Sequence, residues 1–260
     1  MVGVIGARVV DVIRARIVAC LLPALGVGVL GCGSLLLAGS AEAQQTSQAE
    51  PTINALTDAE REAGWELLFD GHSMDGWRGY MMETVPDGWQ ALDGELTRVG
   101  RGRDIITTEQ FANFDLTLEW KVELGGNSGV LFRAVEGPDQ IYMGAPEMQI
   151  LDDENHADGR SPLTSVGSNY ALHPAPPGLA HPVGEWNSLR ILVNGDHVEQ
   201  WLNGVRTVQY ELGSPDWLER VAASKFSEWP EYGQASRGHI GLQEHGDRVA
   251  FRSIKIRRLP

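Results

Sequence analysis

A strict alternation of apolar and polar residues marks the segment NFDLTLEWKVE, residues 113–123. Alternation with a period of two over this length predicts a strand of an antiparallel sheet, with one face buried and the other in water. The face predicted to be buried carries Phe114, Leu116, Leu118, Trp120 and Val122.

Turn residues divide the later part of the chain into further short strands. Asn194-Gly195 and Asn203-Gly204 each separate two alternating segments. Because Asn-Gly favours tight hairpin turns, these dipeptides predict a meander of three strands.

Helix is expected at only two places. In residues 214–224, Ser214 can cap the first turn and Pro215 follows it. Near the N-terminus, Thr57 and Glu60 have the spacing of a capping box.

Many short strands, little helix and 31 glycines predict an all-β domain, an antiparallel β-sandwich or jelly roll. The sequence shows no internal repeat and no linker after Trp65, so residues 65–260 are expected to form one domain. Its predicted core includes Phe114, Leu118, Trp120, Val130, Phe132, Met148, Ile150, Ile240 and Leu242.

The first 43 residues have the pattern of a secretory signal peptide. Three arginines precede a long apolar run, and an Ala-x-Ala ending places the expected cleavage after Ala43. Lipoprotein processing before Cys32 and an uncleaved membrane anchor are the two alternatives. A polar segment, 44–64, follows, and the protein is expected to be periplasmic or secreted. Since both cysteines precede residue 44, the mature domain would be stabilised by its core without disulfides.

The formal net charge is −14 at pH 7. A surface with this charge repels phosphate backbones, so nucleic acid is excluded as an expected partner. The charge does not identify a substrate.

Several predicted strands carry large hydrogen-bonding side chains opposite their apolar face. Such a face can be a plain solvated surface, but amides, guanidinium groups and aromatic rings also suit the hydroxyls and C–H faces of a sugar. The sugar-binding interpretation is preferred. Its residues are Asn127, Arg133, Glu147, Gln149, His239, Gln243 and His245, together with Trp201, which is expected to share one side of its strand with His197 and Glu199.

Six blocks of sequence, in order, resemble the 3-keto-disaccharide hydrolase family. They begin with WELLFDGHSMDGWRG and DGELTRVGRGRDIITTEQFANFDLTLEWKV. GGNSGVLFR, PEMQILDDENHADG, GEWNSLRILVNGDHVEQWLNG and GHIGLQEHGDRVAFRSIKIR follow, so the resemblance covers nearly all of residues 65–259. It implies a concanavalin A-like jelly roll, an extracytoplasmic setting and activity on glycosides whose 3-hydroxyl is oxidised to a ketone. One departure is Gln200, where the family's pattern leads us to expect histidine before WLNG.

The ketone defines which catalytic groups such a site needs. His245 is the first candidate for the base, since histidine takes up and releases protons near neutral pH. Glu147 is the candidate carboxylic acid or alternative base, and Arg133 or Lys225 could bind the ketone oxygen. Asn127, Gln149, Trp201, Lys225 and Gln243 are the expected substrate-binding residues. Each candidate could instead have no role in catalysis. His245 could be a surface histidine in a turn, Glu147 an exposed glutamate on a strand, and Lys225 a surface lysine. Arg133 could form a salt bridge with Glu147.

No cofactor is expected. Asp152, Asp153, His156 and Asp158 could hold Ca²⁺, but their spacing is not that of a known calcium loop. The chain also lacks a dinucleotide-binding fingerprint, so a separate oxidoreductase would have to supply the ketone.

The expected function is cleavage of 3-keto-disaccharides by β-elimination and hydration through an enolate. Two other classes remain open at this point. One is a carbohydrate-binding module without catalysis, and the other is a conventional glycoside hydrolase.

Overall fold

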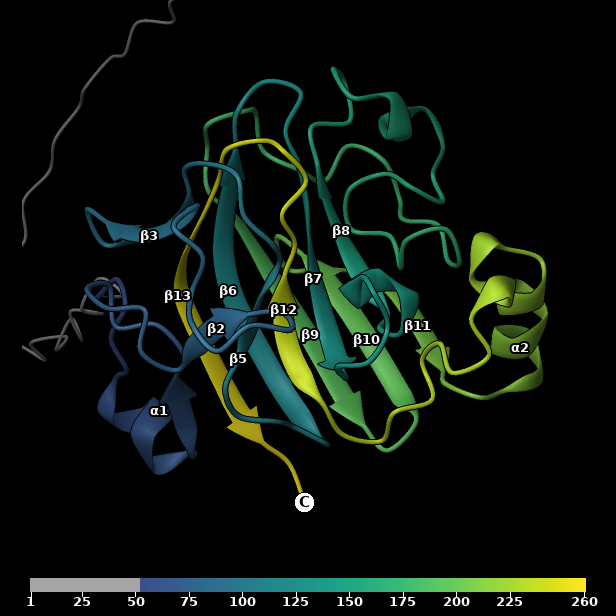
Figure 1. The fold of residues 1–260 in the computed structure, drawn as a ribbon, viewed down its shortest axis with the longest axis horizontal. Helices are drawn as coiled ribbons and strands as arrows, with labels where there is room; N and C mark the ends of the chain where they lie inside the picture. Colours follow the sequence, from purple (N-terminus) through teal and green to yellow (C-terminus); the bar gives the residue numbers. More distant parts are fainter. Residues whose placement is uncertain (1–51) are drawn as a thin grey trace, which may run out of the picture. The chain divides into compact units, whose positions relative to one another are not determined.

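Two antiparallel sheets pack face to face in residues 52–260, the part of the chain that the computed structural model describes (Figure 1). The all-β sandwich expected from sequence is therefore confirmed, and it is a jelly roll. The expected signal peptide, residues 1–43, lies outside the described residues.

The larger sheet has eight strands in the order β11-β10-β9-β6-β13-β4-β3, with β1 also paired to β13. The predicted meander is confirmed, because β9, β10 and β11 are consecutive neighbours joined at the two Asn-Gly turns. The strands are β1 (Trp65–Leu67), β3 (Trp89–Leu92), β4 (Glu95–Arg98), β6 (Phe114–Val122), β9 (Asn187–Asn194), β10 (His197–Leu202), β11 (Val205–Glu211) and β13 (Val249–Arg258).

The smaller sheet has five strands in the order β2-β5-β12-β7-β8. It places β7 and β12 next to each other although more than 100 residues separate them in the chain. The strands are β2 (Trp77–Gly79), β5 (Ile105–Thr107), β7 (Asn127–Ala134), β8 (Glu147–Leu151) and β12 (His239–Leu242).

Helix is confined to short segments in the described residues. Both expected helices form: α1 (Asp58–Glu62) has the predicted capping box of Thr57 and Glu60, and α2 (Pro215–Ala222) is capped by Ser214. Among residues 52–260, none of the helices is long and apolar enough to cross a membrane. Three 3₁₀ turns complete the elements: η1 (Ile141–Met143), η2 (Ala157–Arg160) and η3 (Lys225–Glu228).

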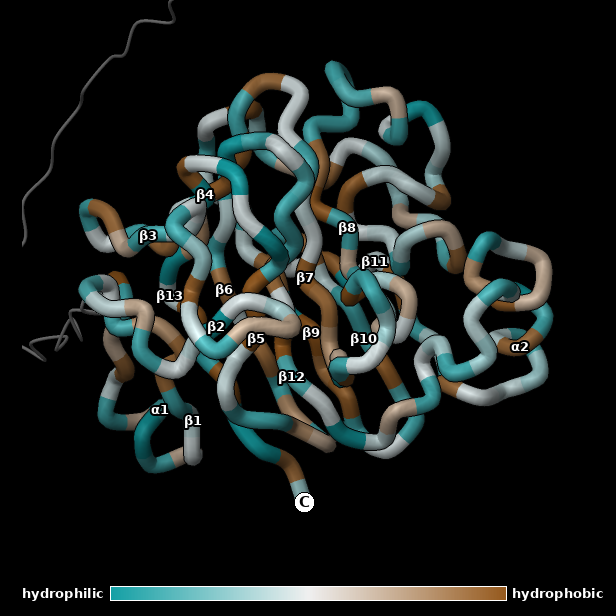
Figure 2. The backbone as a smooth tube through the Cα atoms, viewed as in Figure 1, coloured by the Kyte–Doolittle hydropathy of each residue, from teal (hydrophilic) through white to brown (hydrophobic). Residues whose placement is uncertain are grey.

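The main core lies between the two sheets, and Figure 2 shows hydrophobic positions concentrated along the strands. All nine residues predicted for the core are buried there. On β8, Met148 and Ile150 belong to this core, so Glu147 and Gln149 lie on the outer face of the five-stranded sheet.

This outer face has its own small apolar cluster, which includes Ile106 of β5 and Leu131 of β7. Gly241 of β12 makes room for it, since a Cβ at Gly241 would overlap the end of the Ile141 side chain. The cluster attaches the η1 segment to the sheet and leaves the neighbouring surface over β7 and β8 to polar residues.

Candidate active site

A polar cavity of about 220 Å³ opens over β7 and β8 on the outer face of the five-stranded sheet. At about 30 Å³ per molecule it has the volume of roughly seven waters, which suits a single sugar ring. Six residues expected from sequence come together here, although their roles are still predictions. The lining residues are Asn127, Tyr142, Glu147, Gln149, Asp158, Tyr170, Lys225, Gln243 and His245.

A glycine on β7 creates the space in which Glu147 is buried. Gly129 lies opposite Gln149 in the β7–β8 ladder, and the Glu147 side chain crosses the surface above Gly129. A Cβ at Gly129 would overlap the Glu147 carboxyl. The missing side chain therefore lets a carboxyl lie flat against the sheet, out of water.

The cavity gathers buried polar atoms that have no hydrogen-bond partner within the described residues. They are Asn127 Oδ1, Glu147 Oε1, both Oε1 and Nε2 of Gln149, and Gln243 Oε1. Leaving such atoms unpaired is costly, and native proteins do so rarely. Five of them around one small cavity leave hydrogen-bonding capacity for water or for a ligand with several hydroxyl groups.

Burial raises the pKa of Glu147 to about 8, and the charges of Asp104 and Asp158 add to this. The positive charge of Lys225 opposes the shift. The side chain of Glu147 is therefore largely protonated at neutral pH. A protonated carboxyl can donate a proton or a hydrogen bond, which an ionised one cannot.

Lys225, at the start of η3, brings a positive charge to the cavity between aromatic rings. Its Nζ lies 4.5 Å from the ring centre of Tyr170 and 5.0 Å from that of Tyr142. Cation–π attraction at these distances stabilises the charged ammonium. The loop that carries Lys225 is joined to the core by Phe226, which is buried and stacks on Tyr232.

Tyr142 and Tyr170 are lining residues that sequence reasoning did not predict. Tyr170 donates a hydrogen bond of 3.2 Å from its hydroxyl to Asp158 Oδ2. Burial, together with the nearby Asp158 charge, raises the pKa of Tyr170 above its usual range, so the hydroxyl stays protonated. Tyr142 lies in the 3₁₀ turn η1 and Tyr170 in a turn after η2, where no alternation of polar and apolar residues shows which way a side chain points.

His245 lies at the rim of the cavity, in the turn between β12 and β13. Its ring is 6.1 Å from the ring of His156, at an interplanar angle of 77°. His156 in turn lies 3.4 Å from Asn127, between Nε2 and Nδ2. The imidazole of His245 is exposed to solvent.

Two buried residues hold the turn that carries His245. The backbone N–H of Glu244 donates to Asp104 Oδ1 at 2.7 Å, and burial raises the pKa of Asp104 to about 6. The guanidinium of Arg98 contacts both the Glu244 carboxylate and the Gly246 carbonyl. We call this arrangement of Arg98, Asp104 and Glu244 the turn clamp.

Arg133 does not line the cavity, so its expected place beside Glu147 is wrong. The register of β7 against β12 shifts between His239 and Gly241, and Arg133 has a φ of 49°. At this bulge the alternation that puts odd-numbered residues outward is lost. The guanidinium instead donates to the carbonyls of Ala112 (2.9 Å) and Gly195 (2.8 Å), which joins loops at one end of the sandwich.

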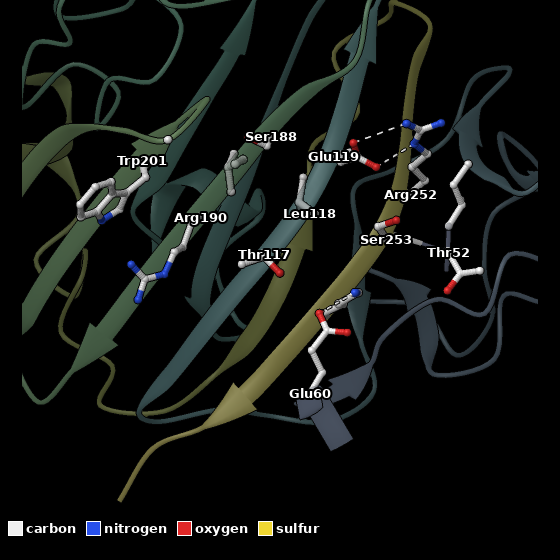
Figure 3. Close-up of a pocket in the computed structure, with 14 residues that line it drawn as sticks. Thr52, Glu60, Thr117, Leu118, Glu119, Ser188, Arg190, Trp201, Arg252 and Ser253 are labelled. Carbon is white, nitrogen blue, oxygen red and sulfur yellow. Dashed lines mark hydrogen bonds and ion pairs between the residues drawn. The ribbon is translucent and has the colours of Figure 1, made fainter. Parts of the chain in front are cut away.

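Trp201 is also absent from the cavity. It belongs to β10 in the eight-stranded sheet and faces outward there, next to Arg190 of β9 (Figure 3). The expected sharing of one face by His197, Glu199 and Trp201 is correct. Alternation shows which residues share a face but not which sheet the strand joins, so the expected position of Trp201 beside the substrate is wrong.

The acidic turn after β8 is organised by its own hydrogen bonds. Asp152 accepts from the backbone N–H of Gly125 (2.7 Å) and from the side chain and backbone of Asn155. Asp153 Oδ1 accepts from the backbone N–H of Val166 (2.8 Å). Within residues 52–260 no three His, Cys, Asp or Glu side chains are grouped as metal ligands. The geometry of Asp152 therefore fits a turn-capping role.

A small pocket of amides, tyrosines and a protonated carboxyl on a jelly-roll sheet is the kind of site that binds sugars. The chain belongs to the family described as 3-keto-alpha-glucoside-1,2-lyase-like domain, which matches residues 64–257. The resemblance seen in the sequence is thereby confirmed.

Two relatives extend this comparison over most of the chain. A protein of Bacteroides thetaiotaomicron named 3-keto-disaccharide hydrolase is 36% identical over 278 residues, covering 90% of this chain and 96% of its own. A crystal structure from Parabacteroides distasonis, called a "putative glycosyl hydrolase", is 34% identical with a TM-score of 0.76. It covers 80% of this chain and 100% of its own.

Proposed function

We propose that this protein cleaves 3-keto-glycosides by β-elimination across C1 and C2, followed by addition of water. The family description, a 1,2-lyase of 3-keto-α-glucosides, and the name of the Bacteroides relative both support this substrate class. A ketone at C3 makes the hydrogen on C2 acidic, so the bond to the leaving group can break without an oxocarbenium ion.

The elimination uses three groups that line the cavity. His245 takes the hydrogen from C2 as a proton, and the electron pair moves to the C3 oxygen to form an enolate. Lys225 stabilises that oxygen with its charge and a hydrogen bond. The enolate then returns its electrons, forms the C1–C2 double bond and breaks the bond from C1 to the glycosidic oxygen, which takes its proton from Glu147.

Hydration restores the starting state of the enzyme. Glu147, now ionised, accepts a proton from a water molecule as its oxygen attacks C1 of the enone. The protonated His245 returns a proton to C2. The products are a 3-keto sugar and the free aglycone, so the overall change is hydrolysis.

The burial of the Glu147 carboxyl over Gly129, which raises its pKa, is the observation that carries this proposal. A leaving-group acid must hold its proton at the working pH, and burial of the Glu147 side chain keeps its proton in place up to about pH 8. Lys225, close enough to influence that pKa, supplies the positive charge that an enolate needs. Of the two cations considered for this role, Lys225 is the better candidate, because it lines the cavity while Arg133 donates to loop carbonyls elsewhere.

In this proposal the unpaired amide oxygens of Asn127, Gln149 and Gln243 accept hydrogen bonds from hydroxyls of the oxidised ring. The cavity holds about one ring, which leaves the aglycone toward the solvent. A separate oxidoreductase would introduce the ketone before the substrate reaches this protein.

Deuterium incorporation tests the mechanism. When a 3-keto-glucoside is cleaved in D₂O, the released 3-keto sugar should carry deuterium at C2, beyond a control without enzyme that measures slow exchange of the product. Direct hydrolysis leaves the C2 hydrogen in place. Release of sugar without this excess deuterium would refute elimination, and release from the unoxidised glycoside would indicate a conventional glycosidase.

Two variants separate the proposed roles. His245→Ala should lower exchange and release together, by roughly 10²–10⁴-fold, because both need the base. Glu147→Gln should continue to exchange deuterium into the substrate while releasing little product. His72→Ala, at an exposed histidine that does not line the cavity, is the matched control and should behave as wild type.

A further inference from the structure

A second concave site lies on the opposite face of the sandwich, across β6, β9, β10 and β13 (Figure 3). Its volume is about 570 Å³, and we call it the outer groove. The strands here alternate between core residues such as Leu116 and Ile191 and outward residues such as Thr117 and Arg190. The outer groove is therefore separated from the Glu147 cavity by both sheets.

Short side chains on two neighbouring strands form the floor of the outer groove. Thr117 of β6 and Ser188 of β9 point outward where the flanking positions carry long side chains. Thr117 is half-buried and Ser188 is exposed. Leu118 and Leu189, their neighbours on the same strands, also line the outer groove, so its floor reaches the sheet itself.

An aromatic side chain forms one wall. Trp201 is half-buried, and the guanidinium carbons of Arg190 and Arg206 each lie 5.7 Å from its ring centre. Its indole N–H donates to Glu199 Oε2 at 3.1 Å, which fixes the ring on the sheet. Because Trp201 is half-buried between these two arginines, only the exposed part of its fixed indole offers an apolar surface beside hydrogen-bonding groups.

Ion pairs form the opposite wall. Arg252 Nε donates to Glu119 Oε2 at 2.8 Å, and Lys255 Nζ donates to Glu60 Oε1 at 2.7 Å. On the tryptophan side, Arg190 Nε likewise donates to Asp115 Oδ1 at 2.6 Å. Each cation that lines the outer groove thus has a carboxylate partner, and the groove presents many donors and acceptors without an excess of either charge.

From this balance of charge we propose that the outer groove binds a neutral polysaccharide chain, independently of the Glu147 cavity. A neutral sugar offers hydroxyls to the paired guanidinium and carboxylate groups and a C–H face to Trp201. An anionic polymer would have to displace Glu119, Glu60 or Asp115 from its partner and would meet the net negative charge of the chain. Binding here would hold the protein on a glycan while the cavity acts on small oxidised sugars.

Native affinity electrophoresis of the full-length protein tests this proposal. The gels would contain soluble starch, hydroxyethylcellulose, arabinoxylan or galactomannan as neutral probes, and polygalacturonate as the anionic probe. At least one neutral polymer should retard the wild type, and Trp201→Ala should lose at least tenfold in apparent affinity for it. Thr117→Tyr, which fills the floor with a residue favoured in strands, should lose the retardation as well.

Controls keep the result specific to the outer groove. Trp65→Ala removes another half-buried tryptophan of the same sheet that does not line the groove, and it should bind as wild type. Gln149→Ala, in the cavity, should also be retarded as wild type. Cleavage of a 3-keto-glucoside by Trp201→Ala shows that this variant is folded; if no variant cleaves that substrate, near-ultraviolet circular dichroism serves instead.

Four outcomes would overturn the proposal. The first two are no retardation by any neutral polymer and retardation that survives Trp201→Ala. The third is retardation lost in Gln149→Ala alone, which would assign polymer binding to the cavity. The fourth is stronger retardation by polygalacturonate than by the neutral probes. None of these results depends on whether the cavity performs elimination.

Discussion

The carboxyl of Glu147 occupies the space that any side chain at Gly129 would need. The two residues lie on neighbouring strands, β8 and β7, and Gly129 is paired directly with Gln149. The backbone of Gly129 is not in the left-handed region, so glycine is required there for space and not for its φ angle. Burial of the proposed acid thus depends on the absence of one methyl group.

Gly129→Ala should therefore abolish most activity while the fold persists. The added methyl displaces the Glu147 carboxyl toward solvent, which removes the desolvation that raises its pKa. Cleavage of a 3-keto-glucoside should fall by roughly 10²–10⁴-fold, the usual cost of losing a general acid.

The matched control is Gly100→Ala, where the nearest atom to a new Cβ is 3.8 Å away and φ is ordinary. It should retain wild-type activity. Wild-type kcat in Gly129→Ala, with the fold verified by circular dichroism, would show that the position of this carboxyl is unimportant.

The protonation of Glu147 also predicts how stability depends on pH. An exposed glutamate loses its proton near 4.5, whereas folded Glu147 keeps its proton up to about pH 8. Folding therefore takes up a proton between these values, and this contribution to stability is lost as the pH rises through them. Glutamine does not titrate, so Glu147→Gln lacks this pH dependence. The wild type should therefore lose stability relative to the variant from pH 5 to pH 8, and the melting temperature of the variant minus that of the wild type should increase steadily over this range.

Differential scanning fluorimetry across that range measures the effect, which is on the order of a few kcal/mol for a shift of this size. A constant difference between the two proteins would mean that Glu147 is already ionised at neutral pH. The same proton should be visible in catalysis, since kcat of the wild type should fall as the pH rises above about 8.

Lys225→Met tests the enolate-stabilising charge. Methionine keeps the apolar contact with Tyr142 and Tyr170 but removes the ammonium. We expect kcat to fall by roughly 10²–10³-fold, as for other groups that stabilise a developing oxyanion. Lys121→Met is the control, because Lys121 pairs with Glu95 on the other sheet. Equal activities of the two variants would show that Lys225 takes no part in the mechanism.

The residues of the turn clamp do not line the cavity, but breaking the clamp should still reduce catalysis. Arg98→Met removes the contacts to Glu244 and Gly246, so the turn that carries His245 becomes mobile. Amide hydrogen exchange in residues 243–248 should rise, and kcat should fall roughly 10- to 100-fold with a smaller change in KM. Arg248→Met breaks only an exposed pair with Glu123 and should change neither quantity. Unchanged exchange in Arg98→Met would show that other contacts hold the turn.

Arg133 should matter for stability and not for binding. Its buried guanidinium joins Ala112 and Gly195 at one end of the sandwich, so Arg133→Ala leaves both carbonyls unpaired. The free energy of unfolding should fall by about 2 to 3 kcal/mol, as for other buried hydrogen bonds to charged groups. Urea unfolding measures this, and KM for the 3-keto-glucoside should stay at the wild-type value. A raised KM with unchanged stability would show that Arg133 binds the substrate.

Most of the strands could be predicted because alternation and turn chemistry are local. The strand at 114–122, the two Asn-Gly hairpins and the cap at Ser214 depend on residues a few positions apart, and each forms as expected. The polar face that carries Glu147, Gln149 and Asn127 follows from the same rule, since register within a strand determines which side chains share a face.

The positions of Arg133 and Trp201 could not be predicted from alternation and turn residues alone. A bulge at Arg133 breaks the alternation, and it arises from the pairing of β7 with β12, which is distant in the chain. Trp201 has the predicted face but belongs to the other sheet. Tyr142 reaches the cavity from η1 and Tyr170 from a turn, and the direction of both segments is determined by packing, so no sequence period identifies them.

The amino-acid sequence by itself determined the class of fold, the composition of its core and the polar residues of β7, β8 and β12, because these follow from repeating patterns and from resemblance across six blocks. Only the tertiary structure decided which polar residues meet. It brought Lys225 and not Arg133 to the cavity, placed Trp201 on the outer groove, and buried Glu147 over Gly129. The physical reason is that a pKa, a cavity and a shared site depend on side chains from distant strands, and their separations are established only when the sheets pair and pack.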